Sequence, residues 1–144
     1  AYALGANWKT TGTLAYVWGE NSTDDRALPQ TPPLEGTLAI DYDNSTYSGG
    51  MLLRAVAEQD RVDIGSGNIA GTDIDETPGF AVLSAHGGYR MSKQVKFTAG
   101  VDNVLDRTYA EHLNGGALNI DGYEPTKQVN EPGRSYWLKV TASF

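Results

Sequence analysis

The 144-residue sequence predicts an all-β protein: about seven antiparallel strands that form the C-terminal part of a transmembrane β-barrel. Three observations predict this fold class. Apolar and polar residues alternate along several segments, short and long connections alternate between these segments, and no apolar run approaches the ~20 residues that a membrane-spanning helix needs. A helical membrane protein is therefore excluded.

The alternation is clearest in the last predicted strand, 135–144. Tyr136, Leu138, Val140 and Phe144 share one face with Ala142, and the other face carries mainly polar residues. The same period of two recurs upstream, where one face is apolar and the other is rich in small and charged residues. The predicted strands are 2–8, 13–20, 34–42, 49–58, 83–90, 95–102 and 135–144.

The connections between these strands are alternately short and long. The short ones are 9–12, 43–45 and 92–94, and the long ones are 21–33, 59–78 and 106–132. Transmembrane barrels have short periplasmic turns at one end and longer outer loops at the other. Aromatic residues near the strand ends are expected to form interfacial belts: Trp8, Tyr42, Tyr47, Tyr89 and Phe144 at the short-turn end, and Trp18, Tyr109 and Tyr136 at the other.

A soluble antiparallel barrel or sandwich is the alternative fold, because its strands alternate in the same way with the apolar face turned inward. The small and charged residues of the polar face and the clustering of the long loops at one end favour the membrane. Single-chain bacterial barrels have an even number of strands, from eight upward, and an open edge in lipid leaves backbone groups unpaired. We therefore expect preceding strands outside these residues.

The composition excludes several other classes of function. The formal net charge is −7 and the 11 Lys and Arg residues are scattered, which argues against a nucleic-acid partner. The chain has no Cys, so disulfide scaffolds and thiolate chemistry are excluded. Its first residues lack the features of a secretory signal, so we expect any export signal to lie upstream.

Two segments near the end of the chain resemble the TonB-dependent outer-membrane receptors. In that family the penultimate strand runs into the motif Asn-Leu-Phe-Asp-x-x-Tyr, and the last strand begins Glu-Pro-Gly-Arg and ends in Phe. Here 103–109 reads Asn-Val-Leu-Asp-Arg-Thr-Tyr, with Leu105 in place of the usual Phe, and 131–134 reads Glu-Pro-Gly-Arg. Residues 28–34 and 78–90 resemble the family's Pro-rich descent from an outer loop and its third-last strand.

This resemblance implies that residues 1–144 are the C-terminal part of a 22-stranded receptor barrel, whose N-terminal strands and plug domain lie outside the chain. It implies a bacterial outer-membrane receptor that imports a scarce metal ligand with energy relayed by TonB. The implied partners are those strands and the plug, TonB through the missing N-terminal part, the outer-membrane assembly machinery, lipopolysaccharide and lipid. We expect no intrinsic cofactor and no enzymatic activity.

The identity of the cargo rests on a shorter similarity. The run Tyr-Ala-Glu-His-Leu-Asn at 109–114, together with 129–138, is most similar to the TonB-dependent copper receptors. Related runs occur in ferric-siderophore and haem receptors. We therefore favour a copper ion as the cargo and keep a ferric siderophore or haem as the alternatives.

His112 is the candidate metal ligand, because imidazole suits copper and an outer loop can reach the mouth of a barrel. Glu111 and Asp121 are near it in sequence. Copper also favours thioether ligands, but Met51 and Met91 are distant in sequence. The alternative for His112 is an ordinary loop residue, and we expect the main ligands to lie outside this chain.

Two further features of the sequence suggest a function. His86 and Ser84 suggest a nucleophile and base, but alternate residues of one strand stand ~6.5–7 Å apart at Cα, and a barrel lipase would present its nucleophile to lipid. A hydrogen-bonded histidine facing the lumen is the better interpretation. Phe144, with Tyr136, Leu138 and Val140, resembles the C-terminal signal that the outer-membrane assembly machinery recognises.

Overall fold

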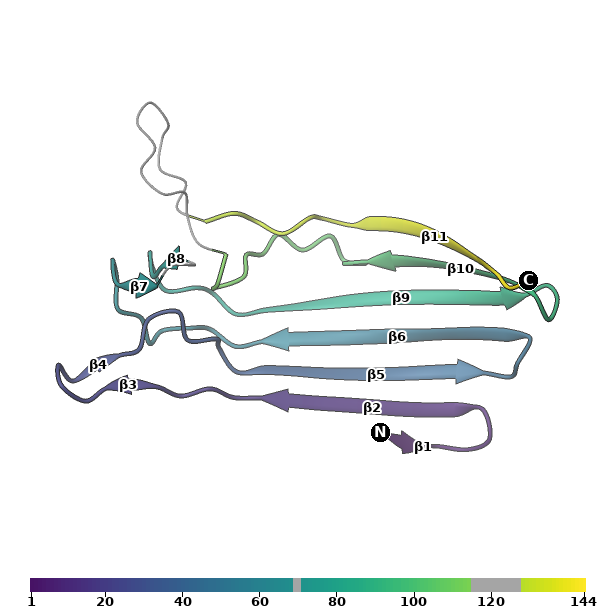
Figure 1. The fold of residues 1–144 in the computed structure, drawn as a ribbon, viewed down its shortest axis with the longest axis horizontal. Helices are drawn as coiled ribbons and strands as arrows, with labels where there is room; N and C mark the ends of the chain where they lie inside the picture. Colours follow the sequence, from purple (N-terminus) through teal and green to yellow (C-terminus); the bar gives the residue numbers. More distant parts are fainter. Residues whose placement is uncertain (69–70, 115–127) are drawn as a thin grey trace, which may run out of the picture.

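The computed structural model describes residues 1–68, 71–114 and 128–144, and all regular structure in them is β (Figure 1). One seven-stranded antiparallel sheet has its strands in chain order: β1 (Tyr2–Ala3), β2 (Trp8–Ala15), β5 (Glu35–Asp43), β6 (Tyr47–Val56), β9 (Phe80–Arg90), β10 (Val95–Asp102) and β11 (Ser135–Ala142). Two short hairpins, β3 (Glu20–Asn21) with β4 (Arg26–Ala27) and β7 (Gly67–Asn68) with β8 (Gly71–Thr72), lie in the long connections. In the described ranges no helix is long and apolar enough to cross a membrane.

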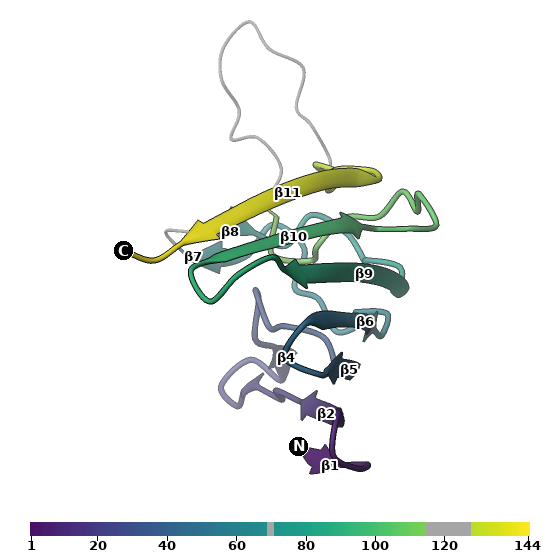
Figure 2. The same ribbon diagram turned by 90° about the vertical axis from the view of Figure 1, so that its right-hand side faces the viewer.

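The predicted alternation of connection lengths is confirmed. The short connections lie together at the right of Figure 1, and the long ones with their two small hairpins lie at the left. Viewed from the short-connection end, the sheet curves from β1 to β11 (Figure 2). The three long connections therefore share one end of a curved wall.

The first predicted hairpin is wrong. The turn was expected at 9–12, but these residues lie inside β2, which pairs with β5 from Trp8 opposite Tyr42 to Ala15 opposite Glu35. The chain turns instead at 4–7, where Gly5 has a φ of 153°. The two threonines in 9–12 favour an extended backbone, whereas Gly5 adopts a positive φ without a side-chain clash.

The apolar faces predicted for the individual strands combine into one continuous surface. Leu53 stands opposite Leu38 on one side and Leu83 on the other, and Phe97 stands between Tyr89 and Val140. All of these side chains except the half-buried Leu83 are exposed: Leu38 is 57% exposed and Val140 54%. In the described residues the only buried hydrophobic side chains are Val56, Val82 and Ala110.

This distribution fits a membrane wall and does not fit a soluble sandwich. A sandwich would bury the apolar face against a second sheet, and the described residues contain no such layer. Burying apolar surface is the main favourable term in folding, roughly 25 cal/mol for each Å². The apolar face therefore requires an apolar environment such as lipid, and the opposite, polar face is the lumenal one.

The aromatic belt is present at the short-connection end, and at the other end Tyr136 is exposed on the apolar face as expected, whereas Tyr109 differs from expectation. Trp8 packs against Tyr42 with ring centroids 5.0 Å apart, and Tyr47 stacks on Tyr89 at 5.4 Å. Tyr109 instead packs on Phe80 at 4.3 Å, and Phe80 alternates onto the polar face. Tyr109 therefore belongs to a cluster on the lumenal side and not to an outer belt.

Candidate functional site at the outer end of the wall

The three long connections meet around Asp73, whose residue surface is only 2% exposed. Its Oδ1 accepts hydrogen bonds from the backbone N and the Nε2 of Gln30, at 2.9 and 3.0 Å, and its Oδ2 accepts one from the backbone N of Asp63 at 3.0 Å. A buried carboxylate needs such donors, because leaving it unpaired costs several kcal/mol. We call the surrounding group the loop junction: Gln30, Gln59, Asp73, Thr77, His112 and Gln128.

His112 brings the last long connection into the loop junction. Its Nδ1 lies 2.9 Å from Thr77 Oγ1, and its Nε2 lies 3.5 Å from Asp73 Oδ1. Gln128 donates from Nε2 to the same Thr77 hydroxyl at 3.0 Å. His112 Nε2 is buried and has no hydrogen-bond partner in the described part of the chain. Burial lowers the pKa of His112, with the nearby Asp73 carboxylate opposing that shift, so a neutral imidazole is favoured at pH 7.

The Pro-rich segment 28–34 is held at the same junction. Its prolines interrupt the pairing that β2 and β5 would otherwise continue, and Gln30 adopts a φ of 58°. Gln59 stabilises the excursion by donating from Nε2 to the Thr31 carbonyl at 2.7 Å. Gln59 also exchanges two backbone hydrogen bonds with Thr77, which carries the β6–β9 pairing beyond the strand ends.

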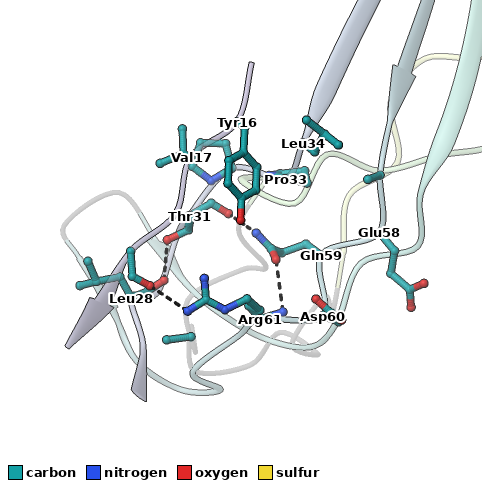
Figure 3. Close-up of a pocket in the computed structure, with 14 residues that line it drawn as sticks. Tyr16, Val17, Leu28, Thr31, Pro33, Leu34, Glu58, Gln59, Asp60 and Arg61 are labelled. Atoms are coloured by element: carbon teal, nitrogen blue, oxygen red, sulfur yellow. Dashed lines mark hydrogen bonds between the residues drawn. The ribbon is translucent and has the colours of Figure 1, made fainter. Parts of the chain in front are cut away.

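A small pocket of about 140 Å³ opens beside this segment (Figure 3). Tyr16, Leu34 and Pro33 line one side of it, and Gln59 and Arg61 line another. Arg61 donates from Nη2 to the Gly19 carbonyl at 3.1 Å and stacks 4.7 Å above the Trp18 ring. These contacts tie the base of the β3–β4 hairpin to the neighbouring loop.

A second cluster fixes the last connection to the lumenal face, and we call it the arginine clamp. Arg54 on β6 forms a bidentate pair with Glu35 on β5, at 2.9 and 2.7 Å, and a second ion pair with Glu111. Its guanidinium lies 5.3 Å from the Phe80 ring centroid, on which Tyr109 packs. Burial, with the carboxylates Glu131 and Glu111 nearby, raises the pKa of Tyr109, so its phenol stays protonated.

The residues proposed from sequence are only partly brought together. His112 points into the loop junction, Glu111 belongs to the arginine clamp, and Asp121 lies outside the described residues. The described ranges contain no group of three His, Asp or Glu side chains that could hold a metal ion. The role of His112 as a metal ligand therefore stays a prediction.

The other two features lie on opposite faces of the wall. His86 is on the lumenal face with its Nε2 3.8 Å from Asp41 Oδ1, and no hydrogen bond joins it to Ser84. Tyr136, Leu138 and Val140 are 73%, 71% and 54% exposed on the apolar face, and Phe144 follows the last ladder contact, from the Ser143 N to the Gln94 carbonyl. The assembly-signal role of these residues remains a prediction.

Sequence reasoning missed the residues that organise the outer end. Asp73 is one of several spaced acids in its loop, and Arg54 is one of the charged residues on the polar face of its strand. The clamp had a detectable signal, because Arg54 stands opposite Thr37 and Glu35 is two residues from Thr37 on the same face. The contacts of Asp73 had none, since its partners are at irregular positions in three different connections.

Acidification is expected to weaken the loop junction through His112. Because its folded pKa lies below the ordinary value near 6.5, the undocked loop binds the proton first. The contribution of neutral His112 to the stability of the docked loop is complete above about pH 6.5. It falls as the pH drops below this value, by at most about 1.4 kcal/mol per pH unit. Hydrogen exchange of residues 110–114 in the full receptor at pH 7.5 and 5.5 measures this loss. His112→Gln should remove most of the difference, and an unchanged pH effect in that variant would assign it to other groups.

Comparison with known proteins identifies the family to which this sheet belongs. A family model described as "TonB dependent receptor-like, beta-barrel" matches residues 2–104. The ferric enterobactin receptor of Pseudomonas aeruginosa is 34% identical over 146 residues, which cover 99% of this chain and 19% of that receptor.

Solved structures agree with this assignment. The copper transporter OprC is 48% identical, with a TM-score of 0.94 over 99% of this chain and 22% of its own. A mutant ferric enterobactin receptor of Pseudomonas aeruginosa is 25% identical, with a TM-score of 0.72 over 98% of this chain and 20% of its own. The chain thus spans about a fifth of the length of these relatives. It belongs to the TonB-dependent receptor family and forms part of that family's β-barrel.

Proposed function

We propose that this chain is part of the wall of an outer-membrane receptor that imports copper in a TonB-dependent manner. The observation that carries the choice of copper is the 48% identity and TM-score of 0.94 to a copper transporter over nearly the whole chain. The corresponding values for the solved ferric enterobactin receptor are 25% and 0.72. Family membership implies the bacterial outer membrane and partners outside these residues: the N-terminal strands and plug, TonB, lipopolysaccharide and lipid.

Import of a ferric siderophore is the second candidate. It is favoured by the 34% identity to a ferric enterobactin receptor over 99% of this chain. The described long loops supply no thioether ligand for copper, because Met51 lies on the apolar face of β6 and Met91 in a short connection at the other end. Haem remains an alternative from sequence similarity alone. The decisive ligands are proposed to lie in the rest of the receptor.

Uptake by cells distinguishes these candidates. A strain that lacks the receptor gene and carries the full receptor on a plasmid is given copper or ferric enterobactin under limitation of the respective metal. We expect the receptor to raise copper accumulation several-fold, and to do so only in cells with functional TonB. If copper accumulation equals that of the empty-plasmid strain and iron uptake is restored, the cargo is the ferric siderophore and not copper.

Deletion of Phe144 is expected to lower the amount of receptor in the outer membrane by several-fold. Phe144 follows β11, an alternating strand whose apolar face includes Tyr136, Leu138 and Val140, and we propose that the assembly machinery recognises this pattern. Surface labelling of intact cells measures the effect. Phe97→Ala, which removes a phenyl ring from the same face of β10, is the control and should insert. Normal surface levels of the deletion variant would contradict the signal role.

A further inference from the structure

Six residues of the lumenal face form one row across the sheet. In order from β2 to β11 they are Lys9, Asp41, Gly50, His86, Gly100 and Trp137, each opposite the next. Two of them are glycines, and each stands between larger neighbours. At Gly50 and Gly100 the row therefore has no side chain that projects from the sheet.

Gly50 lets side chains from two non-adjacent strands approach each other. Asp41 on β5 and His86 on β9 are separated by the whole width of β6, about 9.6 Å between backbones at the usual strand spacing. A Cβ added to Gly50 would overlap both Asp41 Oδ1 and the His86 ring. Only glycine at this position leaves the space between the carboxylate and the imidazole open.

The His86 imidazole and the Asp41 carboxylate face this space without forming a hydrogen bond with each other. His86 Nε2 and Asp41 Oδ1 are 3.8 Å apart, beyond the range of a hydrogen bond. Their side chains are 39% and 43% exposed, and neither forms a hydrogen bond with another described residue. In the described residues an imidazole nitrogen and a carboxylate oxygen thus both lie open on the lumenal face.

The spacing suits a metal ion. Imidazole nitrogen and carboxylate oxygen bind divalent transition metals at about 2.0–2.2 Å, so an ion between the two atoms would need little movement of either side chain. Copper(II) accepts this mixture of nitrogen and oxygen ligands. We infer that Asp41 and His86 form a copper(II)-binding site on the lumenal wall, with water completing the coordination.

The neighbours of the pair define the character of this site. The indole of Trp137 lies over Gly100, the next member of the row after His86, and would cover the β10 side of the site. Lys9 stands opposite Asp41 on the other side, in the β2–β5 ladder. With two protein ligands the site is weak, which suits a point of passage for an imported ion. The choice of copper(II) rests on the proposed function.

The experiment counts copper(II) bound to the purified full receptor by electron paramagnetic resonance and calorimetry. We expect His86→Ala and Asp41→Asn each to weaken one class of sites at least tenfold, and His86→Ala to remove its nitrogen coupling. Gly50→Ala should weaken the same class while retaining both ligands. Gly87→Ala is the matched control, because a Cβ there meets only the Ser48 carbonyl at 3.9 Å.

Equal copper affinities and equal numbers of sites in the wild-type receptor and all three variants would overturn the inference. The proposed function fails differently. If cells carrying the wild-type receptor accumulate no copper while the purified protein still loses a site in His86→Ala, the site stands and the cargo is wrong. Correct folding of each variant is confirmed by heat-dependent migration in gels, and Gly50→Ala tests the site even if His86→Ala does not fold.

Discussion

Replacing Asp73 by Asn in the full receptor is expected to release the outer loops from one another. The carboxylate accepts from Gln30 on one oxygen and from the Asp63 backbone on the other. An amide has only one accepting oxygen, so its NH2 group must face a donor on one side. Each buried polar group left unpaired costs about 1–3 kcal/mol.

The expected result is faster hydrogen exchange in all three connections, because Asp73 joins segments 28–34 and 59–78 and faces His112. A loss of about 3 kcal/mol corresponds to a roughly hundredfold increase in exchange where opening is local. Asp75→Asn is the matched control, since the hydrogen bond that its side chain accepts comes from the adjacent Glu76. Equal protection in the two variants would show that the loops are held by other contacts.

The wall could be predicted from sequence because its physical rule is simple. Every strand with one face toward lipid must alternate, and alignment of the apolar faces excludes a one-residue slip in the pairing register. The range 95–102 agrees with β10 to the residue, and the predicted apolar residues of β5, β6, β9 and β10 stand opposite one another. The register also places Arg54 near Glu35, so half of the arginine clamp was accessible in principle.

The first hairpin and the loop junction could not be predicted in this way. At 9–12 a glycine after two threonines resembles a turn, and only the ladder with β5 shows that the strand continues. The junction depends on pairs such as Gln30 and Asp73, 43 residues apart in two irregular segments. No periodicity links such positions, and a buried Asp among several exposed acids has no distinguishing local sequence.

The arginine clamp makes the second large prediction. Arg54→Met keeps the apolar stem beside Phe80 but leaves Glu35 and Glu111 without their common cation. Hydrogen bonds to charged groups contribute about 1.5–3 kcal/mol each. The side chain of Arg54 is 27% exposed, so solvent screening reduces this figure. We expect residues 105–114 to exchange about ten- to thirtyfold faster in the full receptor, which corresponds to about 1.4–2 kcal/mol.

Arg90→Met is the control for loss of an arginine on the same face, because Arg90 donates to the Ser45 carbonyl at the other end of the wall. A double-mutant cycle with Glu111→Gln separates the clamp from general effects of charge. If Arg54 holds the loop through Glu111, the second substitution adds little once Arg54 is gone. If the two effects simply add, Glu111 is held by something other than Arg54, and the last connection reaches the lumenal face mainly through Tyr109 on Phe80.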